Sequence, residues 1–296
     1  MDSHTGADGR FASQPEILPP GPTPGSEPQQ PRGWYPPPQP PPRPPRRHWA
    51  SAPATYWLVG INCAIFIAMV FSGASVMEPT TQDILHWGGD SGPLVLLNGE
   101  WWRLFTAMFV HIGIIHLATN MWCLWNLGLL GEPLLGEFGM FSAYVLTGLA
   151  GNLLDIAMRP GFSINNPGSI TLSASAGASG AVFGLAGVLL MLLRSPLLPI
   201  PPLELKKLRR SVWYFAIINF VIGIGANLTL TSIRIDNYAH LGGFLSGIAL
   251  GIPLVPRIGA IRTIFVRRRA IAVGAMAFLL LLAAWWLHAV YSPSIG

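Results

Sequence analysis

Seven apolar segments, each about as long as a helix that crosses a bilayer, constrain this chain more than any other feature. Of its 296 residues 51% are hydrophobic and only 10% are charged, and the mean hydropathy is +0.47. Only helices and closed barrels satisfy every backbone polar group inside a bilayer. We therefore predict an all-α polytopic membrane protein and exclude a soluble enzyme. The segments lie at about 55–73, 112–130, 138–158, 174–193, 211–229, 238–255 and 270–291.

The distribution of basic residues predicts the orientation of these segments. Hydropathy alone allows a count of five, because polar residues and glycines interrupt the second and sixth segments. Lysine and arginine accumulate in the short loops on the cytoplasmic side of a membrane. Every second loop of this chain is rich in them, whereas the loops between carry only Arg103, Arg159 and Arg234. This alternation requires seven spans, with the amino terminus inside and the carboxyl terminus outside. The predicted inner basic residues are Arg43, Arg46, Arg47, Arg194, Lys206, Lys207, Arg209, Arg210, Arg257, Arg262, Arg267, Arg268 and Arg269.

Residues 1–50 differ in composition from the rest of the chain. They hold more than half of its 28 prolines and few residues able to form a core. Such a composition favours a disordered, PPII-prone tail, which we expect in the cytoplasm; the sequence does not identify a partner for it. Cys63 and Cys123 fall in apolar segments at no metal-ligand spacing, which favours packing residues over a disulfide or a zinc site.

Two polar residues, Ser179 and His240, stand among small residues near the heads of the fourth and sixth segments. A polar side chain in a span must be partnered, face a cavity or do chemistry. Both segments run inward in the predicted orientation, and Ser179 lies ~7 Å below the outer end of its helix at 1.5 Å per residue. His116 and Asn120, one turn apart on the second segment, fall at a similar depth. Four polar side chains from three helices are thus expected to converge.

Ser179 alone has a plain structural explanation, since small residues such as Ser179 and Gly180 let helices approach closely. His240 favours catalysis, because imidazole is costly inside a span. Gly243 and Gly247 form a ridge that would press the sixth helix against the glycine-rich fourth. A histidine with an ordinary pKa can accept the serine proton at neutral pH and return it to a leaving amine. We therefore predict a Ser179–His240 dyad.

The remaining polar residues near this pair leave alternatives open. His116 and Asn120 could stabilise the negative oxygen of a tetrahedral intermediate, or they could bind backbone or water between helices. Asp155 or Asp236 could orient the histidine, although capping of the sixth helix suits Asp236 better. The prediction therefore includes no third catalytic residue.

A metal site is the other chemistry that these histidines suggest. It would need His111, His116 and His240, and no acidic or cysteine ligand accompanies them at a recognisable spacing. We therefore predict no metal, and we expect a structural role for His111 at the helix mouth.

Together these residues resemble the rhomboid family of intramembrane serine proteases over about residues 55–255. The order and spacing of the motifs are more specific than any single one. The motifs are Trp102-Arg103, His111-x-x-x-x-His116-x-x-x-Asn120, Glu132, Gly177-Ala178-Ser179-Gly180 and Ala239-His240-x-x-Gly243-x-x-x-Gly247.

The resemblance implies a six-helix rhomboid-like core at 51–256, with a cavity that opens outward. A basic cytoplasmic linker at 257–269 and one additional C-terminal transmembrane helix at 270–296, with a short external end, would follow. The resemblance also implies Ser179 as nucleophile and His240 as general base. The oxyanion site would comprise the Ser179 backbone amide and the side chains of His116 and Asn120.

The same resemblance implies supporting roles for residues outside the dyad. Trp102 and Arg103 would be structural anchors of a loop at 74–111 that lies partly in the outer leaflet. Glu132 would stabilise the inner loop. Phe183 stands where a tyrosine often stacks on the histidine, so stacking can survive without the hydroxyl group.

The predicted function is a serine endopeptidase that cleaves a transmembrane segment of another membrane protein through an acyl-enzyme, without a cofactor. The expected partners are transmembrane protein substrates and the lipid bilayer, and no nucleic acid. We expect a bacterial inner membrane, because no organellar targeting pattern is evident. One alternative is a catalytically silent rhomboid-like protein that binds membrane clients, whose usual mark is loss of the serine or histidine. The other is a transporter, which would show repeated halves and a site near the bilayer centre.

Overall fold

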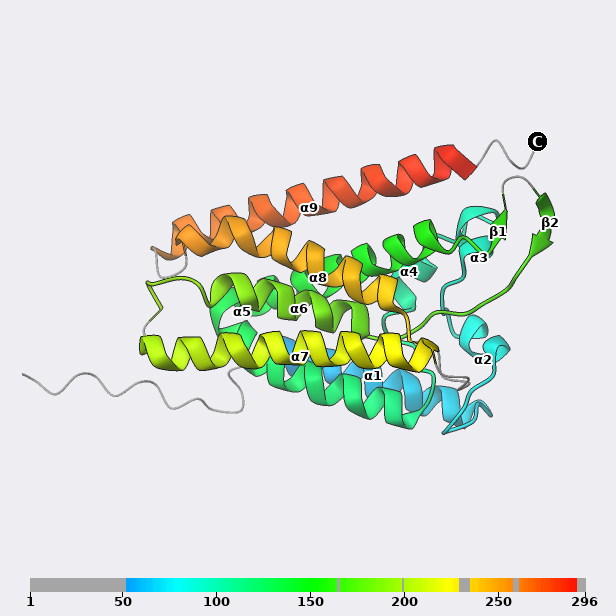
Figure 1. The fold of residues 1–296 in the computed structure, drawn as a ribbon, viewed down its shortest axis with the longest axis horizontal. Helices are drawn as coiled ribbons and strands as arrows, with labels where there is room; N and C mark the ends of the chain where they lie inside the picture. Colours follow the sequence, from blue (N-terminus) through cyan, green and yellow to red (C-terminus); the bar gives the residue numbers. More distant parts are fainter. Residues whose placement is uncertain (1–51, 164–165, 199, 229–234, 258–260, 292–296) are drawn as a thin grey trace, which may run out of the picture. The chain divides into compact units, whose positions relative to one another are not determined.

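The computed structural model describes residues 52–163, 166–198, 200–228, 235–257 and 261–291. The predicted tail at 1–50 and the predicted external end after residue 291 lie outside these ranges. The described chain is helical apart from one short hairpin, in agreement with the predicted all-α class (Figure 1). Its α-helices are α1 (Pro53–Phe71), α2 (Thr81–His86), α3 (Gly92–Leu96), α4 (Arg103–Thr106), α5 (Ile114–Met158), α6 (Ser179–Leu192), α7 (Pro202–Leu228), α8 (Asn237–Gly251) and α9 (Arg262–Tyr291).

Four described helical stretches are long and apolar enough to cross a membrane: Pro53–Phe71, Ile114–Met158, Asn237–Val255 and Thr263–Tyr291. The stretch Asn237–Val255 consists of α8 and the first residues of a 3₁₀ turn at Ile252–Arg257 that extends it. The stretch Thr263–Tyr291 is most of α9. Two predicted spans fall outside this set. Residues 211–228 of the predicted span at 211–229 lie within α7, which begins with a charged turn; residue 229 lies outside the described residues. The predicted span at 174–193 corresponds to α6.

The second and third predicted spans lie within the single element α5. The chain turns within it at Gly136, whose backbone is non-helical with φ 73° and ψ 165°. A side chain is strained at this φ, so glycine allows the bend between the two halves. The Arg269 guanidinium of α9 donates a hydrogen bond to Leu135 O, beside the bend. The base of α9 is therefore fixed to the point where α5 changes direction.

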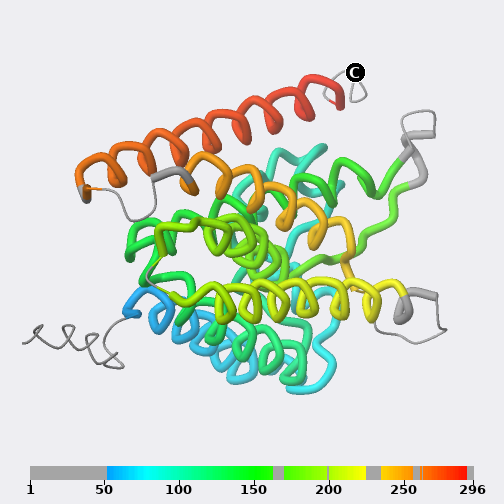
Figure 2. Tube along the Cα trace, turned by 60° about the vertical axis from the view of Figure 1, so that its left-hand side comes forward, coloured from blue at the N-terminus to red at the C-terminus, as the bar shows by residue number. Residues whose placement is uncertain are grey.

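Helix α6 has only 14 residues, and every residue from Gly180 to Leu192 is buried. It packs mainly on α5 and α8 and more lightly on α7, and it lies among these helices in both views (Figures 1 and 2). A helix surrounded by other helices does not need the length of a lipid-facing span. Helix α6 begins at Ser179, five residues after the predicted start at 174, and it is correspondingly shorter than the predicted span.

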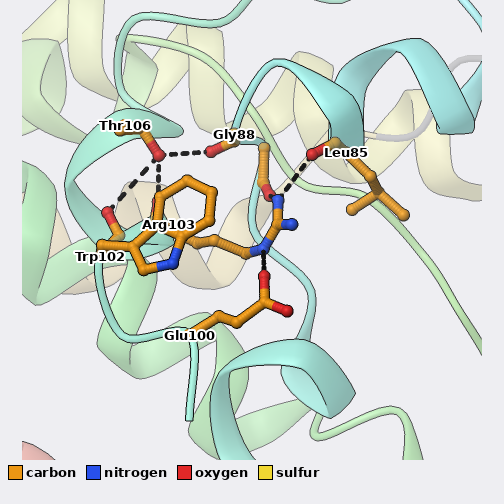
Figure 3. A network of polar contacts seen from close by, with 7 residues as sticks. Leu85, Gly88, Glu100, Trp102, Arg103 and Thr106 are labelled. Atoms are coloured by element: carbon orange, nitrogen blue, oxygen red, sulfur yellow. Dashed lines mark hydrogen bonds and ion pairs between the residues drawn. The ribbon is translucent and has the colours of Figure 1, made fainter. Parts of the chain in front are cut away.

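The loop between α1 and α5 carries α2, α3 and α4 and is held together by Arg103 (Figure 3). The guanidinium donates to Leu85 O at 2.6 Å and to Gly89 O at 2.9 Å, and it pairs with Glu100 at 2.5 Å. The Trp102 ring lies 4.5 Å from the Arg103 guanidinium carbon. These contacts agree with the expected anchoring of this loop.

Helix α9 begins at Arg262, so much of the predicted basic linker at 257–269 is helical. Its C-terminal end packs through Leu287 and Tyr291 against apolar residues of α3 and α5. Most of its other apolar side chains are exposed, which suits contact with lipid. A small antiparallel hairpin, β1 (Phe162–Ser163) and β2 (Asn166–Ile170), follows α5 and was not predicted.

Candidate active site

Ser179 is the first residue of α6, and the two residues before it are tightly held. Gly177 N–H donates to Ala107 O at 2.9 Å, and Ala178 N–H donates to His111 Nε2 at 3.5 Å. Gly177 has φ +135°, and a Cβ there would lie 2.5 Å from the His116 ring. Only glycine fits this backbone and this space. The glycine two residues before Ser179 thus allows the backbone conformation with which the chain enters α6.

His111 supports this entry from the loop before α5. Its ring is fully buried and lies 5.4 Å from the ring of His116. Burial, and then the neighbouring His116, lower the pKa of His111 to about 3. The ring is therefore neutral at physiological pH, and its unprotonated Nε2 can accept the hydrogen bond from Ala178 N–H.

His240 is the fourth residue of α8, and glycines bring this helix against α6. A Cβ on Gly243 would lie 2.0 Å from Gly180 O, and one on Gly247 would lie 2.0 Å from Gly184 O. The two backbones are thus closer than any side chain would permit. This confirms the predicted Gly-x-x-x-Gly ridge, which sets the distance between the helices that carry Ser179 and His240.

The start of α8 is capped by Asp236, as the sequence suggested. Its side chain accepts a hydrogen bond from Ala239 N–H at 2.9 Å. This satisfies one of the amides that the first turn of a helix leaves without a partner.

Phe183, one turn after Ser179, stacks on His240 as expected. The ring centroids are 4.3 Å apart and the planes meet at 14°. His240 is buried, and its Nδ1 has no hydrogen-bond partner. The described residues show no hydrogen bond between Ser179 Oγ and His240.

A cavity of about 610 Å³ joins the predicted site residues. Ser179, His240, His116 and Asn120 all line it, as does Phe183. Four polar side chains from α5, α6 and α8 therefore do converge on one space. The Asn120 amide donates to His116 O at 3.0 Å within its own helix, and His116 Nδ1 is buried without a partner.

Glu132 lies elsewhere and binds the start of α1. Its carboxylate accepts from Ala54 N–H at 2.9 Å, from Thr55 N–H at 2.8 Å and from the Thr55 hydroxyl at 2.6 Å. Glu132 lies within α5, so it stabilises the N-terminus of α1 rather than the inner loop that the sequence suggested. It does not line the cavity.

The cavity has an acidic end that the sequence reasoning only partly recognised. Asp155 and Asp236 line it together with Arg159, which pairs with both. Asp90 lines it too, fully buried, with neither carboxylate oxygen hydrogen-bonded. Asp90 lies in a loop without periodicity, so nothing in the sequence signalled its burial.

Comparison with known proteins places these features in a family. A family model for the rhomboid domain matches residues 98–257. The chain is 29% identical to rhomboid protease GluP of Bacillus subtilis (strain 168) over 228 residues, which cover 76% of this chain and 40% of that protein. It is 32% identical to RHOMBOID-like protein 2 of Arabidopsis thaliana over 246 residues, covering 71% and 68% of the two chains.

A third relative is Rhomboid-like protease 2 of Toxoplasma gondii, 27% identical over 195 residues that cover 65% of this chain and 62% of that protein. The chain spans between 40% and 53% of the length of the first four curated relatives that it matches. The matched residues include Ser179, His240, His116 and Asn120, and the described helices are those of a multi-pass membrane protein. The chain belongs to the rhomboid family.

Proposed function

We propose that this protein is an intramembrane serine endopeptidase with Ser179 as nucleophile and His240 as general base. The observation that carries the proposal is the shared cavity, which both side chains line from two helices that pack closely through glycines. Stacking on Phe183 limits the rotation of the His240 ring. The names of two relatives, rhomboid protease GluP and Rhomboid-like protease 2, support the same reaction class.

In the proposed mechanism, Ser179 Oγ attacks the carbonyl carbon of the scissile peptide while His240 takes its proton. The imidazolium then protonates the leaving amine, which leaves an acyl-enzyme on Ser179. Water that enters from the outer side then attacks the acyl carbon as it gives a proton to His240. The bond from that carbon to Ser179 Oγ breaks, the imidazolium returns the proton to Oγ, and the acid is released. Catalytic hydrogen bonds are often long or absent without substrate, so the Ser179–His240 bond is expected to form in the complex.

The proposed oxyanion site follows the family resemblance. The Ser179 backbone amide belongs to the first turn of α6, where helix N–H groups lack intrahelical acceptors. His116 and Asn120 line the same cavity from α5. Their side-chain donors would stabilise the charge that develops on the carbonyl oxygen. The Asn120 amide would have to exchange its bond to His116 O for the oxyanion.

The proposed substrates are transmembrane segments of other membrane proteins. A helix hides its peptide groups in hydrogen bonds, so it must unwind before Ser179 can attack. Substrates with glycine or proline near the cut, and a small residue at the cut, are therefore expected.

We further propose a bacterial inner membrane, with the proline-rich tail at 1–50 in the cytoplasm and the end of α9 outside. The basic residues at 194–210 and 257–269 support this orientation. Alkaline phosphatase fused after residue 296 should be active in an intact bacterium, and the same enzyme fused at residue 1 should be inactive. The reverse pattern would invert the proposed topology.

The decisive test of the activity is reconstitution of the purified protein in vesicles with a single-span substrate. The parent should cleave the substrate and should be labelled at Ser179 by a fluorophosphonate, whereas Ser179→Ala and His240→Ala should do neither. Ser246→Ala is the matched control, because Ser246 lies on α8, bonds to Gly243 O and does not line the cavity. Cleavage by the Ser179→Ala variant would exclude the dyad. A folded parent without cleavage or labelling would favour the silent, client-binding alternative.

A further inference from the structure

The Asp236 side chain makes three polar contacts just before α8. One oxygen accepts from Ala239 N–H at 2.9 Å and the other accepts from the Ser175 hydroxyl at 2.8 Å. Arg159, at the end of α5, pairs with the carboxylate at 2.7 Å. A single side chain thus contacts three separate parts of the chain.

The spacing of these contacts relates them to the dyad. Ser175 lies four residues before Ser179, and Asp236 lies four residues before His240. The hydrogen bond between Ser175 and Asp236 therefore joins the approach to the serine directly to the start of the histidine helix. The glycine ridge fixes the distance between α6 and α8 deeper in the protein, and this bond fixes it at the outer end.

Ser175 is also held on its other side. Its backbone forms two hydrogen bonds with the backbone of Asp90, each 2.9 Å long. With its side chain on Asp236 and its main chain on Asp90, Ser175 has little freedom to move. A displacement of Asp236 would consequently pass to the segment that leads into Ser179.

Arg159 supplies the charge that holds Asp236 in place. Its guanidinium bridges Asp236 and Asp155, and its side chain is 44% exposed. Without Arg159, two carboxylates would face each other next to the buried Asp90, and like charges in a poorly hydrated site repel. The cation therefore holds Asp155 and Asp236 together, and Asp236 stays hydrogen-bonded to Ser175.

We propose that Asp236 is a positioning residue that sets the alignment of Ser179 and His240 through Ser175, the cap of α8 and Arg159. The proposal rests on the dyad proposed above. Asp236 need not touch substrate. It holds the two reacting side chains in one geometry, and a displacement of ~1 Å in such a pair can cost about 100-fold in rate.

The test compares Asp236→Ala, Asp236→Asn and Ser175→Ala with the parent in vesicles, by kcat and KM for a single-span substrate and by the rate of fluorophosphonate labelling. Asp236→Ala should lower kcat and labelling by at least about tenfold, with KM nearly unchanged. Asp236→Asn keeps one acceptor oxygen for Ala239 N–H, and its NH2 group can donate to the Ser175 hydroxyl in place of the second acceptor. It loses the charge that pairs with Arg159, so it should recover part of the loss. Ser175→Ala should lower kcat by a smaller factor while it leaves the cap of α8 intact.

Thr80→Ala is the matched control, because Thr80 caps α2 in an exposed capping box away from the cavity. It should lower thermal stability without lowering kcat per folded molecule. Parent-like kcat in both Asp236→Ala and Ser175→Ala would overturn the positioning role while the dyad stands. Equal loss in folded Asp236→Asn and Asp236→Ala would also overturn it. A parent that neither cleaves nor labels would overturn the dyad itself, and the positioning role with it.

Discussion

The ring of Phe183 lies parallel to the imidazole of His240, with ring centroids 4.3 Å apart and planes 14° from parallel. The contact joins α6 to α8, since Phe183 follows Ser179 by one turn of α6 and His240 lies in the first turn of α8. Phe183 also packs against Phe215 of α7, with ring centroids 5.7 Å apart. The imidazole thus has an aromatic wall that is itself supported from a third helix.

Removal of this wall should slow the reaction without unfolding the protein. An aromatic pair contributes about 0.5–1.5 kcal/mol beyond burial, so Phe183→Ala should lower kcat and fluorophosphonate labelling by roughly 3- to 10-fold. Phe183→Tyr keeps the ring and should stay close to the parent. Phe278→Ala, on the exposed face of α9, is the control and should have no effect. A parent-like labelling rate for Phe183→Ala would show that stacking does not orient His240.

Methyl groups on the glycine ridge should separate α6 from α8. Gly247→Ala places its Cβ 2.0 Å from Gly184 O, a backbone atom that cannot move away cheaply. Such overpacking costs about 1–3 kcal/mol, so we expect a lower melting temperature and a loss of labelling. Gly274→Ala in α9 is the matched control, because a Cβ there meets nothing within 4 Å. Equal melting temperatures for the two variants would contradict the close packing.

The sequence predicted those parts of this site that depend on the spacing of residues within one helix. Glycines four residues apart on one helix predict close packing against another helix. A histidine beside them is then predicted to face that same neighbouring helix. Phe183 follows Ser179 by one helical turn, so its place beside the histidine could also be predicted. Each of these relationships needs only the period of a helix and one neighbouring helix.

The parts that the sequence did not predict depend on several distant segments at once. Hydropathy predicts separate spans at 112–130 and 138–158, and the structure has two helical halves that meet at the non-helical Gly136, but the sequence did not predict that helix would fill the residues between the two spans. No local pattern predicts the burial of Asp90, yet it is fully buried and its backbone pairs with that of Ser175. The spacing of Asp155 and Arg159 allows a helical ion pair, but nothing local indicates the second partner of Arg159, Asp236, which is distant along the chain.

Loss of the Glu132 carboxylate should destabilise the fold but leave the chemistry intact. The carboxylate caps α1 with three hydrogen bonds in a buried position, and buried charge-assisted bonds contribute about 1.5–3 kcal/mol. Glu132→Ala should therefore melt at a lower temperature, while labelling per folded molecule stays at the parent rate. Glu132→Gln keeps one acceptor oxygen, so its melting temperature should lie between those of Glu132→Ala and the parent. A loss of labelling in fully folded Glu132→Ala would indicate a link to the site.

Asp90 should make the stability of the protein depend on pH. Burial raises the pKa of Asp90 well above its ordinary value of 3.8, and the carboxylates of Asp155 and Asp236 raise it further, against the opposing effects of Arg159 and Arg103. The folded protein therefore holds this proton more tightly than the unfolded chain. The resulting stability is fully present below the unfolded pKa and is lost as pH rises through the folded pKa.

Asp90→Asn removes the ionisable group while it keeps the shape of the side chain. Melting temperatures from about pH 4 to about pH 8 should therefore fall more steeply with rising pH in the parent than in Asp90→Asn. Asp83→Asn is the control and should keep the slope of the parent, because hydrogen bonds from Thr80 lower the pKa of the exposed Asp83 from 3.8, below the measured range. Any stability that Asp83 contributes is present at neutral pH and is lost as pH falls through its lowered pKa. Parallel pH profiles for the parent and Asp90→Asn would mean that Asp90 titrates alike in the folded and unfolded chain, which its burial without a hydrogen-bond partner argues against.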